Sequence, residues 1–328
     1  MSGSSVSLGP TAAIHALPGL EPDNLLGFLT LLGLLRALEE SHSEWRPKAA
    51  WQGEPLGVSL HLAEAVARPQ VIDATEKGIR SIAKAYDILG QTVSQSSKRC
   101  SKTCEAIPDG EFFEVMNFRS LSERYRWDRA RGQLIASLGS DGFTKRDGEE
   151  VVTSPLRTMF GQGHQHFPSR LKLIATRVNS GDAHNLEIAL FEPWTYGDST
   201  DSFRWDPIED RRYAYQAGDP AKARNKVGTV AGANRLASLG FGVLSCAPTS
   251  SGLGTIGFRG KPHQEMCWPL PGVPTSLPGF MAALSHPALL EDNSISLRSY
   301  GIIAVARASR VQIGKYFNFE RARLDFLR

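Results

Sequence analysis

The chain has 328 residues, enough for about two domains or one large domain. Charged residues make up 22% of the sequence and hydrophobic residues 41%, an ordinary globular composition that excludes a wholly disordered chain. The 37 Lys and Arg against 34 Asp and Glu give a net charge of +3, which excludes a histone-like basic tail but leaves room for a local basic groove.

The clearest predicted element is a helix at residues 25–40. Asp23 or Asn24 is expected to cap its start. Its apolar side chains fall on nearly every face, which predicts a helix surrounded by other elements in the core. Gly27 and Gly33 lower its helix propensity, and the expected compensation is close approach of a partner backbone.

The rest of the chain mixes helical and strand-like patterns. In the first half we expect an extended start at 14–22, strands within 45–62, helices at 71–94 and 112–138 (with a break near Ser120), and a loop or hairpin at 139–153. In the second half we expect helices at 168–178, 185–191, after Val230 and at 280–285, and strands at 241–246, 253–258, 265–268, 300–306 and 311–319.

This order of elements predicts a mixed α+β fold, because it lacks the regular βαβα alternation of a doubly wound sheet. The Gly-rich stretch at 139–153 indicates a boundary between an N-terminal, mainly helical region at 1–140 and a C-terminal α+β region with antiparallel strands at 150–328. One large domain is the alternative.

Two features bear on the compartment. Residues 1–10 carry no Lys or Arg, and the apolar run at 25–38 has about 14 residues, too few to span a bilayer. We therefore expect a soluble, cytoplasmic protein without a membrane partner. The cysteines are expected to be reduced thiols, with a zinc site that includes His263 as the alternative: Cys100, Cys104, Cys246 and Cys267.

The segment at 161–166, Gly-Gln-Gly-His-Gln-His, is a glycine-punctuated loop before a predicted helix. Backbone N–H groups at such a helix start bind phosphate, although the spacing is neither that of a P-loop nor that of a dinucleotide fingerprint. The alternatives are a structural turn and a metal site with His184. Candidate nucleic-acid contacts in and after this loop are Gly161, Gly163, His164, His166 and Arg170.

A second segment, residues 203–213, mixes carboxylates, arginines and aromatic side chains. Asp206, Glu209 and Asp210 are residue types that hold Mg²⁺ for phosphodiester cleavage. The interleaved arginines favour a self-neutralising ion-pair network instead. In a third interpretation, Arg211 and Arg212 contact a nucleic-acid backbone.

Positive charge also gathers in short clusters that suit phosphate binding. One cluster mixes arginines with Tyr125 and Trp127, a combination that engages both phosphates and bases. Its alternative is a solvated helix face offset by Glu123 and Asp128. The candidate nucleic-acid contacts in these clusters are Lys98, Arg99, Lys102, Arg124, Arg126, Arg129, Lys222, Arg224 and Lys226.

Several stretches resemble one family. The start, with Leu-Pro-Gly-Leu at 17–20 and Asn-Leu-Leu-Gly-Phe-Leu at 24–29, is similar to proteins encoded in type I-G (formerly I-U) CRISPR loci. So are Phe-Arg-Trp-Asp-Pro at 203–207, Gly-Ala-Asn-Arg-Leu-Ala at 232–237 and Thr-Ile-Gly-Phe at 255–258. These motifs are packing and turn patterns, not catalytic signatures.

The resemblance implies a subunit, large-subunit-like or accessory, of a Cascade-type RNA-guided surveillance complex. Its partners would be CRISPR RNA, target DNA, other Cascade subunits and a recruited helicase-nuclease. In such complexes base pairing reads the target, while protein recognises the protospacer-adjacent motif and contacts the backbone. We accordingly expect a non-catalytic nucleic-acid-binding protein with no cofactor and no bound metal.

Two other functions stay open at this point. A metal-dependent nuclease would use His164 and His166 with Asp206 and Asp210. A structural adaptor would dock partner proteins through exposed aromatic side chains, expected at Trp194, Tyr196 and Trp205.

Overall fold

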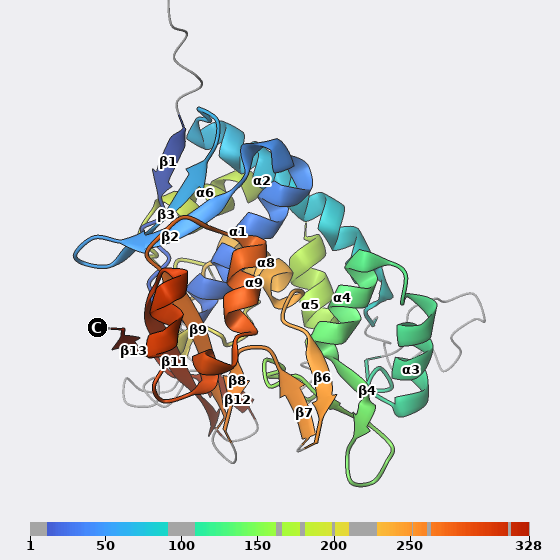
Figure 1. Cartoon of the computed structure of the whole chain (residues 1–328). Coiled ribbons are helices and arrows are strands. Elements are labelled where there is room, and N and C mark those ends of the chain that lie inside the picture. Colours follow the sequence, from blue (N-terminus) through green and yellow to red (C-terminus); the bar gives the residue numbers. More distant parts are fainter. Residues whose placement is uncertain are drawn as a thin grey trace, which may run out of the picture.

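Helix α1 (Leu25–Ser41) lies at the centre of the fold in the computed structural model (Figure 1). Asn24 caps it, because its side chain accepts a hydrogen bond from the backbone N–H of Gly27 at 3.3 Å. The helix is buried along most of its length, which confirms the predicted core helix. The structure describes residues 12–90, 109–161, 166–177, 181–198, 201–209, 228–250, 252–260, 264–313 and 316–327.

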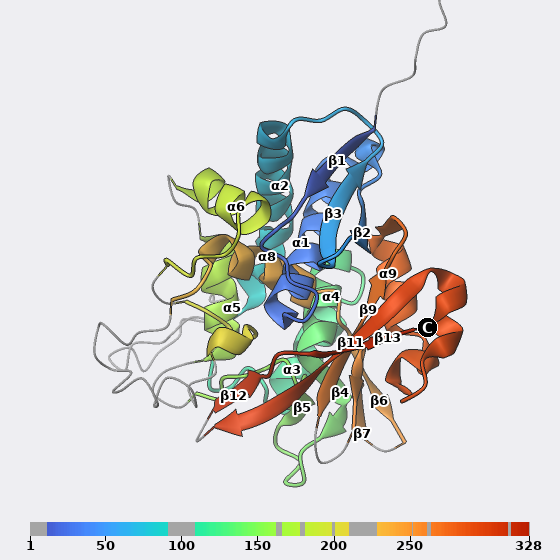
Figure 2. The ribbon, with the colours of Figure 1, turned by 90° about the vertical axis from the view of Figure 1, so that its left-hand side faces the viewer.

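Helices from both halves of the chain pack against α1: α2 (Arg68–Ala83), α8 (Ala231–Phe241) and α9 (Leu277–Leu284). Further helices of the described residues are α3 (Val115–Arg124), α4 (Arg129–Leu138), α5 (Phe167–Thr176) and α6 (Asp182–Phe191). Short 3₁₀ turns are η1 (Ser43–Trp45), η2 (Lys84–Ile88), η4 (Pro207–Glu209), η6 (Pro287–Leu290) and η7 (Ile295–Tyr300). Figure 2 shows α5, α6 and α8 on one side of α1 and α9 on the other.

The strands of the described residues pair antiparallel throughout. One sheet has the order β1-β3-β2-β10: β1 (Ala13–Ala16), β3 (Gly57–Leu62), β2 (Lys48–Gln52) and β10 (Thr275–Ser276). Another has the order β12-β11-β9-β8, with β13 also on β11: β12 (Tyr316–Phe319), β11 (Ile302–Ile313), β9 (Glu265–Pro271), β8 (Phe258–Arg259) and β13 (Arg323–Phe326). The hairpins are β4 (Gly139–Thr144) with β5 (Val151–Thr153) and β6 (Cys246–Thr249) with β7 (Gly252–Thr255).

Two glycines allow α1 to pack backbone against backbone. A Cβ atom at Gly33 would lie 1.9 Å from the carbonyl oxygen of Leu236 in α8. On the other side, a Cβ atom at Gly78 in α2 would lie 1.9 Å from the carbonyl oxygen of Ala37. These contacts confirm the close approach expected at Gly33, and they fix α1 between two helices that lie far apart in sequence.

The second sheet also reaches α1. Trp268 of β9 stacks on Phe28, with ring centroids 5.6 Å apart and an angle of 18° between the rings. Its indole N–H donates to the carbonyl of Pro22 at 3.2 Å. One hydrophobic core therefore joins residues from both sides of the predicted 140–150 boundary; the division of the chain there stays a prediction.

The fold is α+β, with an N-terminal helical part and a C-terminal part rich in antiparallel strands, as predicted. Some element boundaries were predicted wrongly. Residue 241 ends α8, so the strand predicted at 241–246 begins only at Cys246. The helical stretch 112–138 breaks at 125–128 rather than near Ser120. Among the described residues, no helix has the length and apolar character needed to cross a membrane.

Candidate nucleic-acid interface

The connection between α3 and α4 carries Arg124, Arg126, Trp127 and Arg129, a cluster that we call the basic turn. Trp127 is 87% exposed, and the three arginines are exposed as well. The turn forms here because Asp128 caps α4, its carboxylate accepting a backbone N–H of the first helical turn at 3.0 Å. The cap reverses the chain and leaves the preceding indole in solvent.

The charges of this region divide into paired and unpaired groups. Arg131 binds Asp87 at 2.6 Å and Asp128 at 2.7 Å, and Arg119 lies 3.7 Å from a carboxylate of β4. The pKa of Asp128 is lowered, first by the backbone N–H of Arg131 and then by its guanidinium. Asp128 thus offsets Arg131 rather than the basic turn. Among the described residues, the arginines of the basic turn have no ion-pair partner.

The aromatic part of the basic turn remains open to a ligand. The guanidinium carbon of Arg126 lies 5.2 Å from the centroid of the Trp127 ring. Tyr125, in contrast, is half-buried, with the Arg131 guanidinium 5.3 Å from its ring centroid. An exposed indole beside unpaired guanidinium groups can stack on a base while the cations meet phosphates.

The loop before α5 is described only at its ends. Gly161 has a φ of +91°, and an antiparallel bridge joins Phe160 to His166. His166 precedes α5 without capping it through its side chain. Arg170 forms an ion pair with Asp201, so its charge is compensated within the fold. The structure thus places Gly161 next to His166, whereas Arg170 pairs with the carboxylate of Asp201.

Most other predicted contacts fall outside the described residues. These are Lys98, Arg99, Lys102, Gly163, His164, Arg211, Arg212, Lys222, Arg224 and Lys226, together with Asp210 of the nuclease alternative.

Asp206 and Trp205 are buried in the core of the protein. The Asp206 carboxylate accepts hydrogen bonds from Asn24 Nδ2 at 3.1 Å and from the backbone N–H of Ile208 at 3.0 Å. Burial raises its pKa. Trp205 is fully buried and stacks on Phe203 with centroids 4.3 Å apart, so the prediction that Trp205 is an exposed docking residue was wrong. Its indole N–H donates to the backbone carbonyl of Leu156 at 3.0 Å, so this polar group also has its partner inside the protein.

The cysteine and histidine side chains considered for metal binding form no ligand set within the described residues. Cys246 and Cys267 are buried free thiols, and burial raises the pKa of each. Cys100, Cys104 and His263 lie outside the described residues. Within the part of the chain that is described, no three His, Cys, Asp or Glu side chains are grouped so as to hold a metal ion.

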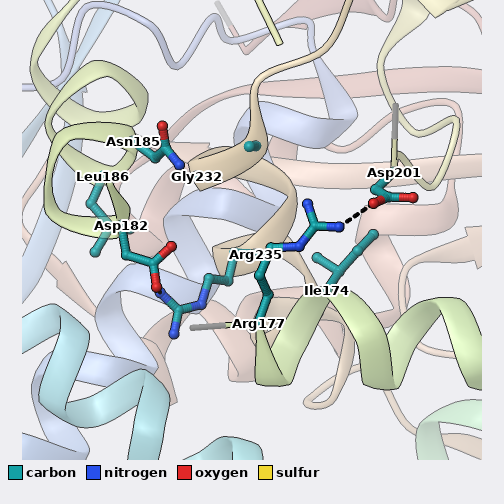
Figure 3. Close-up of a pocket in the computed structure, with 9 residues that line it drawn as sticks. Ile174, Arg177, Asp182, Asn185, Leu186, Asp201, Gly232 and Arg235 are labelled. Carbon is teal, nitrogen blue, oxygen red and sulfur yellow. Dashed lines mark hydrogen bonds and ion pairs between the residues drawn. The ribbon is translucent and has the colours of Figure 1, made fainter. Parts of the chain in front are cut away.

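A pocket lined by α5, α6 and α8 is filled with charge pairs (Figure 3). Arg235 contacts Glu76 at 2.7 Å and Asp182 at 3.2 Å, and Arg177 pairs with Asp201. The free space is about 30 Å³, room for one or two water molecules. These side chains tie helices together and leave no space for a nucleotide.

The C-terminal strands hold arginines with unequal surroundings. Arg307 is buried and donates to Asp325 at 2.7 Å, while Arg321 and Arg323 also pair with carboxylates. Arg310 has no carboxylate partner among the described residues and lies against Arg157, which the sequence analysis missed. In the sequence, Arg157 follows Pro155 and Leu156, and this pattern is too common to single it out.

No protein-family model, no curated protein and no solved structure matches this chain.

Proposed function

We propose that this protein is a non-catalytic nucleic-acid-binding subunit of a CRISPR RNA-guided surveillance complex in antiviral defence. In that complex it contributes to recognition of the protospacer-adjacent motif and to opening of the target duplex. It acts in the cytoplasm with CRISPR RNA, target DNA, the other Cascade subunits and the recruited helicase-nuclease. The resemblance of the stretches at 17–29, 203–207, 232–237 and 255–258 supports the complex.

The basic turn is the observation that supports nucleic-acid binding. Its three arginines, which have no ion-pair partner in the described part of the chain, present charge to phosphates, and its exposed indole presents a flat face to a base. A solvated helix face would pair its cations with neighbouring carboxylates, as Arg131 does with Asp87 and Asp128. This turn makes no such pairs among the described residues.

The test of binding is a salt series with the full chain and labelled duplex DNA. A variant with Arg124→Gln, Arg126→Gln and Arg129→Gln loses up to three phosphate contacts. The slope of log K against log[salt] should therefore become shallower by about 2–3. A control with Lys48→Gln, Lys77→Gln and Arg298→Gln removes the same charge from exposed sites on other elements and should keep the wild-type slope.

The test of the complex is purification of the tagged full chain from its own host. RNA of uniform length and further protein subunits should accompany it. A wild-type affinity that does not change with salt would contradict the binding proposal. Purification without RNA or partner subunits would contradict the proposed complex, even if the isolated chain binds DNA.

A further inference from the structure

Strand β13 lies at an outer edge of the second sheet, on the left-hand side of the molecule in Figure 1. It pairs with β11 on one side, and among the described residues no strand pairs with its other side. An unpaired strand edge presents backbone N–H and C=O groups that bind a further strand. The sheet can therefore be extended at β13.

The register of β13 on β11 determines which of its backbone groups face outward. Successive residues of an antiparallel pair direct their N–H and C=O groups alternately toward the partner strand and away from it. The N–H of Leu327 donates to the carbonyl of Ile303 in β11 at 2.9 Å, so Leu327 faces β11. Leu324 and Phe326 therefore face away, and their backbone groups form no hydrogen bond with another described residue.

The open part of this edge consists of these two residues. Ala322 also faces away from β11, but its N–H donates to the carbonyl of Asp23 at 2.8 Å. A second copy of β13 that runs antiparallel along the first can pair its Phe326 with Leu324 and its Leu324 with Phe326. Each of these pairs exchanges both of its N–H···O bonds. The pairing is two-fold symmetric, as the commonest contact between identical chains is, and it leaves the bond between Ala322 and Asp23 intact.

A cavity of about 320 Å³ lies beside this edge. It is lined by residues 292–295, next to the start of η7, and by residues 325–327, at the end of β13. The buried Arg307 of β11 donates to Ser294 at 2.9 Å and to Asp325 at 2.7 Å, which places the cavity on the face of the sheet that carries the Asp325 side chain. A side chain on that face of an added strand can enter the cavity.

In the antiparallel pairing, the side chain at the cavity is Arg323 of the second copy. Arg323 lies on the same face as Asp325, with which it pairs at 2.8 Å, and its side chain is 68% exposed. The pairing sets it directly opposite Leu327 of the first copy, one of the residues that line the cavity. Asp292 lines the same cavity, and its side chain is 91% exposed. An arginine of each copy thus meets an exposed carboxylate of the other.

The other charges and the apolar surface at the contact fit the same pairing. Asp292 accepts a hydrogen bond from Arg259 at 2.7 Å, and a carboxylate has further lone pairs for a second cation. The two Asp325 side chains meet at the two-fold axis, and the buried Arg307 that each of them binds offsets their repulsion. On the opposite face, Phe326 is 54% exposed and gains an apolar neighbour from the second copy.

We propose that β13 is a self-association site, at which a second copy of this chain adds its own β13 antiparallel to the first. Arg323 of each copy then occupies the cavity of the other. The contact is short, so the dimer should be weak and should dissociate on dilution. The site uses none of the residues of the basic turn, and the proposal therefore goes beyond the function proposed above.

Sedimentation equilibrium of the full wild-type chain tests the association. We expect a reversible monomer–dimer equilibrium with a dissociation constant of about 10–100 µM. Amide hydrogen exchange at Leu324 and Phe326 should slow as the protein concentration rises through this range, because their outward N–H groups gain a partner strand. A chain that stays monomeric up to about 300 µM overturns the proposal and leaves the edge to a different partner. A dimer in which these two amides exchange as fast as in the monomer overturns it as well.

Two charge reversals test the position of Arg323. Arg323→Glu or Asp292→Arg brings like charges together at both ends of the contact, so each variant alone should dimerise at least about tenfold more weakly. A mixture of the two variants restores an opposite-charge pair at both ends and should form heterodimers with close to wild-type affinity. Lys77→Glu, which reverses an exposed charge on α2, is the control and should associate as the wild type does. Unchanged association in the single variants, or no recovery in the mixture, would overturn the proposal.

Discussion

Trp127→Ala should weaken nucleic-acid binding while leaving the folded state nearly intact. Only about an eighth of this side chain is covered by protein. That is about 30 Å² of a large aromatic side chain, or about 0.8 kcal/mol of unfolding free energy at about 25 cal/mol per Å². Loss of one stacked base costs about 1–3 kcal/mol of binding, which corresponds to about 5- to 150-fold weaker affinity for a single strand.

Fluorescence anisotropy with a labelled single strand, at two salt concentrations, measures this effect. Stacking releases no phosphate-bound counter-ions, so the fold-loss should be the same at both concentrations, unlike that of the arginine variant. Trp127→Phe should recover most of the affinity. Tyr300→Ala, which removes another exposed aromatic ring at 63% exposure, is the control and should bind normally. Wild-type affinity in Trp127→Ala, or an equal loss in Tyr300→Ala, would refute the assigned stacking role.

The remaining predictions concern the core. Gly33→Ala should lower the unfolding free energy by about 3 kcal/mol, because the new methyl would meet the rigid carbonyl of Leu236; Gly110→Ala, with open space around it, should change it by less than about 0.5 kcal/mol in the same urea titration. Burial raises the pKa of Asp206 above its ordinary 3.8, so the folded state binds the proton more tightly and loses stability as pH rises through that window. Asp206→Asn cannot ionise, and its unfolding free energy relative to wild type should rise with pH above about 4; a difference that is constant with pH would contradict this.

Local sequence signals predicted the elements that depend on local chemistry. The helix at 25–40 follows from its continuous apolar pattern and from Asn24 as its cap, and the glycine at 33 correctly indicated a close backbone contact. The break before α4 was predicted near Ser120, but it lies at 125–128 because Asp128 caps the new helix, a signal that the run of charges around it obscures. Caps and periodicity therefore determine most of the helices.

Features that depend on contacts between residues far apart in the chain could not be predicted from the sequence. Trp205 lies in a charged, Pro-containing segment and was expected at the surface, yet Phe203 and Phe241 enclose it. In the candidate interface, the sequence analysis placed the residues of the basic turn within the helical stretch 112–138 rather than on a connection between helices, and it could not determine which arginines pair. That depends on Asp87, which is more than 40 residues from its partner Arg131. The Arg157–Arg310 contact is equally non-local.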